Sequence, residues 1–475
     1  MKHWVYIIVF IFSVSLEAKS QEFALTDTLV AATADTANIP LIQVGQIQIS
    51  GNKKTKPYII QRELPFKQGD YMLRSDLLKK LEEAKHNLMN TSLFVDADVY
   101  IASETSDVAF INITVKERWY LFPLPYFKLV DRNFNQWWSE HNRDLKRVNY
   151  GLKFNYNNAS GRNDKLSLYL VTGYSRLIAF GYNQPFADKS LKHGFGVSFM
   201  RGQQREMVYG SAYNKQAFVK TDDFIRTVMK VDLNCYYRPA IKSRHSFRLS
   251  YAEDRINDTI LKLNPRFWGD STRTVTRFPE LAYTYQYFNV DYIPYPSDGL
   301  LGSVHFVKRG VNKQMNLWQI GFNGTWTKTI FPKSQIQFQA GGVMRFPLNQ
   351  PYYNQPLFGY GDLYLRGLEY YVIDASAGFV VRGTARKEVL SFVLKNPLKS
   401  TSHDKVPFRF FLKAFTDAGY AYTKHEGSSM LNNQWLRTWG VGLDILTIYD
   451  FVIKIEYSFN QLNNNGLFLH SKSDF

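Results

Sequence analysis

From residue 147 onward, the chain alternates large apolar side chains with polar ones at almost every second position. In the segment 451–459 the odd positions are Phe, Ile, Ile, Tyr and Phe, and the even positions are Val, Lys, Glu and Ser. This period of two is that of a β-strand, whose side chains point alternately to its two faces. The same alternation recurs in 164–172 and 334–345. The pattern therefore predicts an all-β structure for this part of the chain.

The alternating segments number about sixteen, and each has roughly the length of one tilted membrane crossing. They lie at 147–156, 164–172, 174–183, 192–201, 206–217, 222–237, 243–258, 278–290, 299–309, 315–328, 334–345, 378–396, 408–421, 435–446, 450–460 and 465–475. Their apolar faces are opposed by Lys, Glu and Gln, which suit a water-filled lumen better than the core of a soluble sandwich. We therefore predict a closed, antiparallel transmembrane β-barrel over 147–475. The segment 347–377 is too long for a hairpin turn, and we expect it to be a functional loop folded into the lumen.

A different pattern precedes the barrel, in residues 41–117. A short alternating segment and a short helix at 57–64 are followed by a second helix, which Ser75 is positioned to cap. The apolar side chains of the second helix form one stripe at helical spacing: Leu77, Leu78, Leu81, Ala84 and Leu88. Two further strands are predicted at 94–101 and 108–115. The order β-α-α-β-β describes a compact α+β domain.

Three further segments are assigned from their composition. Residues 1–20 combine a basic start, an apolar run and a small-residue site, which is typical of a cleaved signal peptide. Residues 21–40 contain no aromatic side chain after Phe23 and are expected to be a flexible tether. Residues 118–146 are expected to be a linker into the barrel.

Composition favours a membrane barrel over other classes. The chain has 36 Phe, 31 Tyr and 9 Trp, yet its mean hydropathy is only −0.30. No apolar run long enough for a spanning helix follows the signal segment, whereas a barrel places aromatic side chains on its lipid face. The net charge of +17 is scattered along the chain. This distribution fits a lumen lining or contacts with anionic lipid, and it does not predict a nucleic-acid site.

The sequence contains none of the common catalytic motifs, such as G-x-S-x-G, a P-loop or H-E-x-x-H. His193, His305 and His403 have no companion at metal-ligand spacing. The single Cys235 excludes an intramolecular disulfide and a cysteine-based zinc site. We therefore expect no enzymatic activity, no catalytic residue, no cofactor and no metal site.

Three short motifs resemble, in their order along the chain, those of the BamA/TamA superfamily of outer-membrane insertases and protein transporters. The turn with Pro296 and Gly299 is similar to the family's aromatic-Pro-x-x-Gly turn, which opens a strand. Arg366-Gly367 looks like its arginine-glycine loop motif, and residues 415–419 look like its aromatic-x-Asp-x-Gly strand motif. The N-terminal domain looks like a single POTRA domain. The resemblance thus covers nearly the whole mature chain.

The loop motif also has a physical interpretation. An arginine in a partly desolvated lumen needs a carboxylate, which it binds best as a two-pronged pair. Strand alternation points Asp417 inward, and Glu388 lies on the preceding long strand, so both are expected partners of Arg366. The resemblance implies the same two positions. The alternative is a solvated loop arginine without a fixed partner.

The resemblance implies assembly and insertion of proteins in the bacterial outer membrane, with the POTRA domain in the periplasm. Unfolded polypeptide clients would pair as an additional strand with the exposed edge of that domain. We predict that this edge contains Val95, Ala97, Val99 and Ile101. The seam between the first and last barrel strands would then open toward the lipid. The terminal Phe475 resembles the signal by which such barrels are themselves recognised.

Two other functions remain open at this point. One is a polypeptide-secretion pore of the two-partner type, in which the chain would cross the lumen as the loop moves. The other is a structural or adhesive surface barrel. In each case the expected partners are polypeptides and outer-membrane lipids, with periplasmic accessory proteins as further partners and no nucleic acid.

Overall fold

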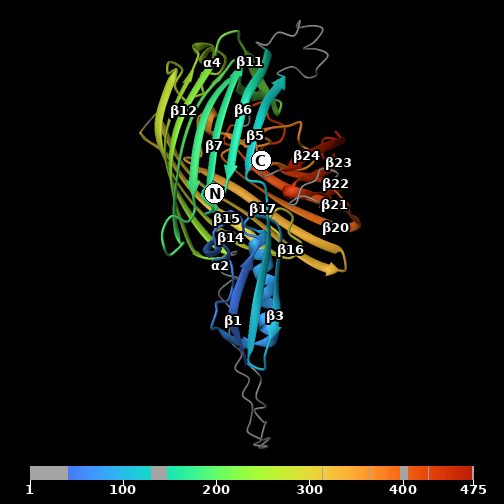
Figure 1. Ribbon diagram of the computed structural model, residues 1–475. Helices are drawn as coiled ribbons and strands as arrows, with labels where there is room; N and C mark the ends of the chain where they lie inside the picture. The colour runs from blue at the N-terminus through green and yellow to red at the C-terminus, as the bar shows by residue number, and fades with distance from the viewer. Residues whose placement is uncertain are drawn as a thin grey trace, which may run out of the picture. The chain divides into compact units, whose positions relative to one another are not determined.

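A computed structural model of the chain describes residues 41–129, 147–312, 314–361, 363–395, 405–425 and 427–472. The expected signal peptide and tether, and the terminal Phe475, lie outside the described residues. From Leu41 onward the chain forms one compact unit, which contains a small N-terminal domain and a large barrel (Figure 1).

The N-terminal domain is a four-stranded sheet with two helices. Its elements are β1 (Leu41–Ser50), α2 (Pro57–Gln61), β2 (Tyr71–Leu73), α3 (Arg74–Met89), β3 (Phe94–Glu104) and β4 (Val108–Glu117). The strand order is β2-β1-β4-β3, with β1 parallel to β4 and β3 antiparallel to it. The short strand β2 adds one element to the predicted β-α-α-β-β order. The order otherwise agrees with the prediction.

Helix α3 forms much of the core of this domain. Its buried residues are Leu77, Leu81, Ala84 and Leu88, four of the five in the predicted stripe. Leu78 is 47% exposed and does not belong to the core. The predicted cap at Ser75 is also wrong, because the N-cap is Leu73 and no side chain caps the helix. The preceding strand β2 fixes the start of α3 instead.

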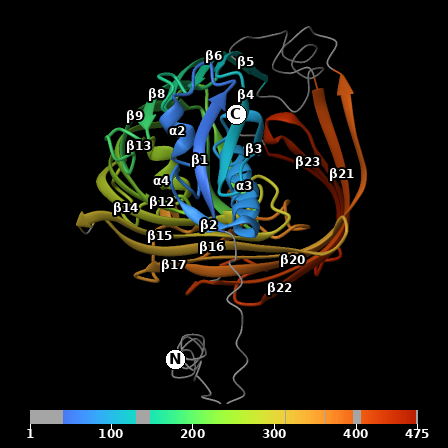
Figure 2. The same cartoon turned by 60° about the horizontal axis from the view of Figure 1, so that its bottom comes forward.

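The barrel wall is one sheet of sixteen strands in which every neighbouring pair is antiparallel (Figure 2). Its strands are β5 (Leu121–Leu129), β6 (Val148–Asn157), β7 (Lys165–Gly173), β8 (Arg176–Gln184), β9 (His193–Gln204), β12 (Arg226–Ala240), β13 (Ser243–Ile256), β14 (Val275–Val290), β15 (Gly299–Asn312), β16 (Met315–Phe331), β17 (Ser334–Phe346), β20 (Ala377–Lys395), β21 (Lys405–Tyr422), β22 (Trp435–Leu446), β23 (Val452–Asn460) and β24 (Gly466–Lys472). At the end away from the N-terminal domain lie the hairpin β10 (Glu206–Ala212) and β11 (Lys215–Lys220) and the helix α4 (Asp258–Leu263). A short 3-10 helix, η4 (Ile448–Asp450), lies between β22 and β23.

The number of wall strands agrees with the prediction, but two of the predicted assignments are wrong. The wall begins at β5, inside the segment 118–146 that was expected to be a linker. Conversely, the expected wall strand 206–217 belongs to the β10–β11 hairpin, which forms a separate two-stranded sheet. Pro123 and Pro125 weaken the strand pattern of β5, yet prolines are tolerated there because β5 is an edge strand.

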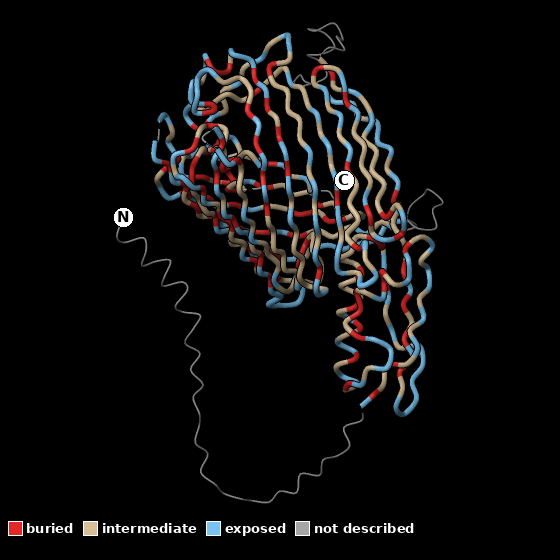
Figure 3. Tube along the Cα trace, turned by 90° about the vertical axis from the view of Figure 1, so that its left-hand side faces the viewer, coloured by how far each residue is buried: buried red, intermediate tan, exposed pale blue. Residues whose placement is uncertain are grey.

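Along the wall strands, exposed residues alternate with less exposed ones (Figure 3). Large apolar side chains exposed on the outer face include Phe195, Leu233, Phe247, Leu281, Phe306, Phe322, Phe338, Leu412, Val441 and Leu469. Buried charged side chains of the opposite face include Asp254, Glu280, Arg345, Arg386, Lys413, Asp417 and Glu456. An apolar outside and a polar inside are typical of a barrel that crosses lipid. Among the described residues, no helix has the length and apolarity needed to span a membrane.

The wall has two edges, β5 and β24. Within the described residues, the strand ladders run from β24 to β5 and no ladder joins these two strands to each other. The expectation of a fully hydrogen-bonded, closed sheet is therefore not met. The two prolines of β5 have no N–H to donate, which limits the ladder that this strand can offer.

Candidate functional site

The lumen loop, residues 347–376, joins β17 to β20 and is folded against the inner wall. It contains the 3-10 helix η3 (Tyr352–Asn354) and the small strands β18 (Pro356–Phe358) and β19 (Ile373–Asp374), which pair with each other. Leu365 and Leu368 of the loop are buried in one apolar cluster with wall residues such as Val380 and Leu436. The loop is thus a packed part of the barrel.

Arg366 of the lumen loop binds Asp417 of β21. Its Nε lies 3.0 Å and 3.2 Å from the two carboxylate oxygens, and a second guanidinium nitrogen donates to Oδ1. The backbone N–H of Arg366 also donates to Oδ2 at 3.0 Å. The side chain of Arg366 is 7% exposed and that of Asp417 is fully buried. This is a desolvated, two-pronged ion pair in which one carboxylate fixes both the side chain and the backbone of the loop.

Two more wall residues complete the surroundings of Arg366. Thr384 of β20 accepts a hydrogen bond from Nη1 at 3.0 Å, and the guanidinium lies 4.1 Å from the centre of the Phe415 ring. On β21, Phe415 and Asp417 therefore contact the arginine from the same face. A Cβ at Gly419, on that face, would lie 2.9 Å from the backbone carbonyl oxygen of Phe379 on β20, so this position favours glycine.

The second predicted partner, Glu388, does not bind Arg366. Its carboxylate pairs with Arg409, whose Nη2 lies 2.6 Å away. Thr384, which does contact Arg366, precedes Glu388 by four residues on the same strand. Four residues of a strand span about 13 Å, too far for Glu388 to reach the same guanidinium. Glu388 therefore lies on the same inward face of β20 as Thr384 but at a different position along the strand.

Gly367 is required by the tight turn that follows Arg366. Its φ of +92° is in the left-handed region, and a Cβ would approach the Ser458 side chain to 3.0 Å. The Gly367 carbonyl accepts a hydrogen bond from Asn460 at 2.6 Å, and its N–H donates to Glu369 at 2.7 Å. The turn therefore lies directly on β23.

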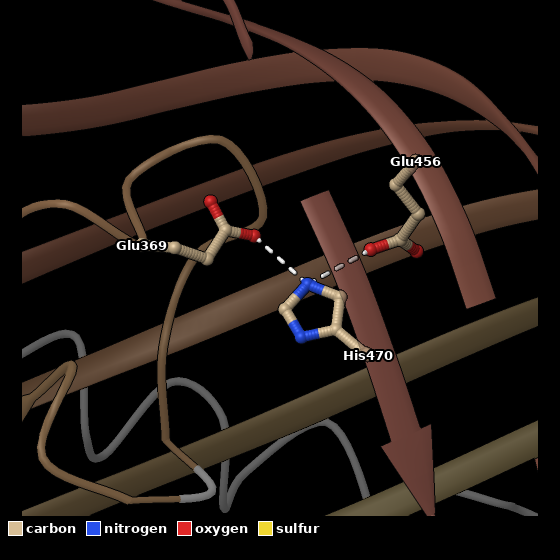
Figure 4. Close-up of side chains that lie close together, drawn as sticks. All are labelled: Glu369, Glu456 and His470. Atoms are coloured by element: carbon tan, nitrogen blue, oxygen red, sulfur yellow. Dashed lines mark hydrogen bonds and ion pairs between the residues drawn. The ribbon is translucent and has the colours of Figure 1, made fainter. Parts of the chain in front are cut away.

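The lumen loop also contacts the last strand of the wall. His470 of β24 lies 3.2 Å from Glu369 and 3.3 Å from Glu456 of β23, as Figure 4 shows. The ring of Tyr370 packs on Phe468 of β24, with centroids 5.2 Å apart. The sequence analysis missed these contacts, because the alternation of β24 shows which side chains face inward but not what they meet.

The predicted strand-opening turn is anchored to the inner wall. Gly299 has a φ of +111°, and a Cβ there would collide with the Asn289 carbonyl at 2.1 Å. The Pro296 carbonyl accepts a hydrogen bond from Arg386 of β20. Tyr295 is buried and donates to Asp444 of β22 at 2.9 Å. The turn therefore links β14 and β15 to β20 and β22 across the barrel interior.

The predicted peptide-binding edge of the N-terminal domain is the edge strand β3. A groove of about 510 Å³ runs between β3 and α3, and Val99, Ile101 and Leu78 line it. Ala97 is fully buried and belongs to the core, so its side chain does not face this groove. Val95 precedes it near a register shift between β3 and β4 and does not line the groove.

Two buried ion pairs, which sequence analysis missed, join the N-terminal domain to the barrel. Arg238, at the end of β12, donates to both carboxylate oxygens of Glu63 at 2.6 Å and 2.7 Å. Arg118 makes the same two-pronged contact with Asp450 at 2.7 Å and 2.9 Å. Burial alone would raise the pKa of the Glu63 carboxyl, but Arg238 and the nearby Arg62 hold it below the ordinary value of 4.5. Glu63 is therefore charged at neutral pH.

Residues 42–118 match the family model for POTRA domains, described as the surface antigen variable number repeat. These residues form a POTRA domain. No curated protein sequence matches the chain significantly.

The chain resembles BamA from Haemophilus ducreyi lacking POTRA domains 1–3, with a TM-score of 0.50 and 15% identity over 91% of this chain and 84% of that chain. Weaker likenesses are to CdiB from Acinetobacter baumannii (TM-score 0.48, 14% identity, 91% and 73% covered) and CdiB from Escherichia coli (TM-score 0.46, 8% identity, 94% and 92% covered). At this level of identity the BamA likeness shows the fold alone. The chain is a BamA-like barrel that follows one POTRA domain.

Proposed function

We propose that this protein assembles and inserts other barrel proteins in the bacterial outer membrane. The observation that carries this proposal is the pair of edge strands β5 and β24, which no ladder joins within the described residues. A protein of this type works by strand pairing and needs no covalent chemistry, cofactor or nucleic acid. Its partners are unfolded polypeptides and the surrounding lipid.

An unpaired wall edge in lipid has a high free energy, because backbone N–H and C=O groups there have no water to bind. A client strand that pairs with β5 or β24 would satisfy those groups and would enter the membrane already hydrogen-bonded. Leu467 and Leu469 of β24 are 67% and 71% exposed on the outer face. Client strands that pair with β24 would continue this apolar outer face, which contacts the lipid.

The lumen loop favours insertion over secretion. A chain crossing the lumen would have to displace this packed loop and break the Arg366–Asp417 pair, whose two side chains are desolvated. Breaking a buried ion pair costs about 3–5 kcal/mol. Insertion at the seam leaves the loop in place. A secretion pore therefore requires an additional opening step that insertion does not.

The POTRA domain would receive clients on the periplasmic side. The backbone of β3 is the free edge of its sheet, and the groove beside it, which has both apolar and charged lining residues, can take alternate side chains of an extended peptide. The exposed Leu78 lies in this groove. Main-chain pairing with little sequence preference suits a receptor for many unfolded chains.

Cysteine cross-linking to a stalled client tests the proposal. In a Cys235→Ser background, single cysteines would be placed at Phe127 on β5, at Leu469 on β24 and, as a control, at Phe306 in the middle of the wall. Phe127 lies opposite the exposed Tyr150 of β6, and all three positions are exposed on the outer face, at 59%, 71% and 48%. We expect disulfides to the client at the two edge positions and not at Phe306.

A further single cysteine at Gln339 separates the two transport functions. Gln339 lies on β17 beside the lumen residue Arg382 of β20. Cross-links that form at Gln339 and not at the two edges would indicate a polypeptide in the lumen and would contradict insertion in favour of secretion.

A further inference from the structure

Three potential metal ligands from separate segments converge on one point of the barrel interior (Figure 4). They are Glu369 of the lumen loop, Glu456 of β23 and His470 of β24, and their ligand atoms all lie within 4.8 Å of one another. The Nε2 atom of His470 is 3.2 Å from Glu369 Oε1 and 3.3 Å from Glu456 Oε2. No metal site was expected from the sequence, because His193, His305 and His403 have no companion at metal-ligand spacing.

The hydrogen bonds at this point leave one buried oxygen unsatisfied. An imidazole nitrogen carries at most one proton, and Nε2 of His470 faces two carboxylates. Oε1 of Glu456 is 2.7 Å from the ammonium of Lys413. Oε2 of Glu456 accepts no hydrogen bond from the described residues, although the side chain is only 1% exposed. A buried oxygen without a donor is costly, and a cation bound there would remove this cost.

The two distances from His470 agree with those between ligands of a tetrahedral ion. Zinc binds histidine nitrogen and carboxylate oxygen at about 2.0–2.2 Å, so the edges of its tetrahedron are about 3.3–3.6 Å long. The two distances from His470 Nε2 are close to this edge length. One imidazole and two carboxylates leave a fourth position for water, and three protein ligands with one water is the arrangement of catalytic zinc sites. Magnesium and calcium prefer sites made of oxygen alone.

We propose that Glu369, Glu456 and His470 bind a divalent transition-metal ion, best fitted by Zn²⁺, which fastens the lumen loop to the last strand of the wall. Neighbouring contacts orient two of the ligands, as is usual around metal sites. The second oxygen of Glu369 accepts the Gly367 N–H at 2.7 Å, and the ring of Tyr364 stacks on His470 at 5.4 Å. The site would connect the turn after Arg366 directly to the edge strand β24. This inference does not depend on the proposed function.

Zinc binding to the purified full-length protein tests the proposal. After chelator treatment in detergent, equilibrium dialysis against zinc chloride should give one bound ion per chain. His470→Gln and Glu369→Gln should each weaken binding by at least about a hundredfold, because even changes behind the ligands cost 10–100-fold. His86→Gln is the matched control. His86 lies 3.2 Å from the single carboxylate of Glu82, and no third potential ligand joins them in the part of the chain that the structure describes, so zinc binding should be unchanged.

Folding and coordination are checked separately. Circular dichroism and the heat-dependent gel mobility of the barrel show whether each variant is folded. Cobalt bound in place of zinc should give the visible absorption of a tetrahedral site, and His470→Gln should abolish it. His470→Cys should retain zinc binding, because a thiolate is itself a zinc ligand. Absence of zinc binding in the wild type, or equal affinity in the folded His470→Gln variant, would overturn the proposal.

Discussion

At the scale of single residues, the Arg366–Asp417 pair and the Arg409–Glu388 pair show how burial decides what an ion pair can do. Both join neighbouring parts of the barrel, but Arg366 contacts both carboxylate oxygens of Asp417, whereas Arg409 contacts a single oxygen of Glu388. The first is desolvated, with side chains 7% and 0% exposed, whereas Arg409 is 43% exposed. A water-exposed pair contributes less than about 1 kcal/mol, and removing one partner of a buried pair costs about 3–5 kcal/mol. Only the buried pair can hold a loop of this length.

Arg366→Ala should release the lumen loop while leaving the wall intact. Asp417 would remain buried without its cation, and the backbone N–H of residue 366 alone cannot replace the guanidinium. We expect a loss of about 3–5 kcal/mol in loop stability, seen as faster protease cleavage within 347–376. Strand content by circular dichroism should be nearly unchanged, and client assembly should be impaired.

Two further variants test whether the contact needs the shape of arginine. Arg366→Lys should rescue poorly, since an ammonium cannot make two parallel contacts with Asp417. The matched control Arg409→Lys changes the exposed pair and should have little effect on loop cleavage. The charge swap Arg366→Asp with Asp417→Arg should recover part of the stability. Full stability of Arg366→Lys would show that the two-pronged geometry is unimportant.

The sequence predicts this pair for a specific reason. The aromatic-x-Asp-x-Gly motif at 415–419 and the alternation of β21 together place Asp417 on the inward face, where it binds Arg366 in the structure. Alternation cannot give the depth of a residue along the strand, and the prediction therefore included Glu388 as a second partner. The contacts of His470 were beyond prediction because they depend on which loop fills the lumen.

At the scale of elements, α3 of the POTRA domain has two apolar faces with different roles. Leu77, Leu81, Ala84 and Leu88 face the sheet and are buried. Leu78 faces outward into the groove beside β3. One helix thus supplies both the core of the domain and one side of the proposed client site.

Leu88→Ala and Leu78→Ala should separate these two roles. Leu88 is fully buried, so its truncation should lower the free energy of unfolding of the domain by about 2–5 kcal/mol. Leu78→Ala should leave stability within about 0.5 kcal/mol and should weaken the binding of extended peptides, because apolar contact in the groove is lost. Chemical denaturation of the full chain and peptide binding by fluorescence anisotropy are the measurements. Unchanged peptide binding in Leu78→Ala would exclude the groove as the client site.

The elements that sequence analysis assigned wrongly share a physical cause. Alternation shows that a segment is a strand but not which sheet it joins, so the β10–β11 hairpin was counted as part of the wall. Tyr213 and Asn214 between these strands both have positive φ, which is typical of a tight hairpin turn. The strand β5 was missed for a different reason, because its prolines weaken the strand pattern. Proline is tolerated in an edge strand, and only the completed sheet shows that β5 is an edge.

At the scale of the whole molecule, buried ion pairs fix the POTRA domain to the barrel. Glu63–Arg238 and Arg118–Asp450 join segments more than one hundred residues apart in the sequence. Sequence analysis could not find these pairs, since each residue taken singly fits a solvated surface. The structure leads us to expect that the domain and the barrel move as one body at neutral pH, and that this coupling depends on the charge of Glu63.

Glu63→Gln should loosen this joint. Arg238 is 7% exposed and would be left buried without a counter-ion, which costs about 3–5 kcal/mol. Spin labels on the POTRA domain and on a barrel turn should show a broader distance distribution than in the wild type. The matched control is Glu83→Gln, which removes a second contact of the same joint, to Lys242 at 2.7 Å. Its side chains are about one-third exposed, so the distribution should change little.

The same measurement has a defined pH dependence. The pKa of Glu63 in the folded protein is below its ordinary value of 4.5, so the unfolded state takes up a proton first as the pH falls. The contribution of Glu63 to the joint is complete above about pH 4.5 and is lost as the pH falls through the lowered pKa. The wild-type distance distribution should therefore be constant between about pH 5 and 8 and broaden only in stronger acid. Glu63→Gln has no carboxylate to protonate there and should be broad throughout. Broadening of the wild type near pH 6 would mean that another group, such as a histidine, controls the joint.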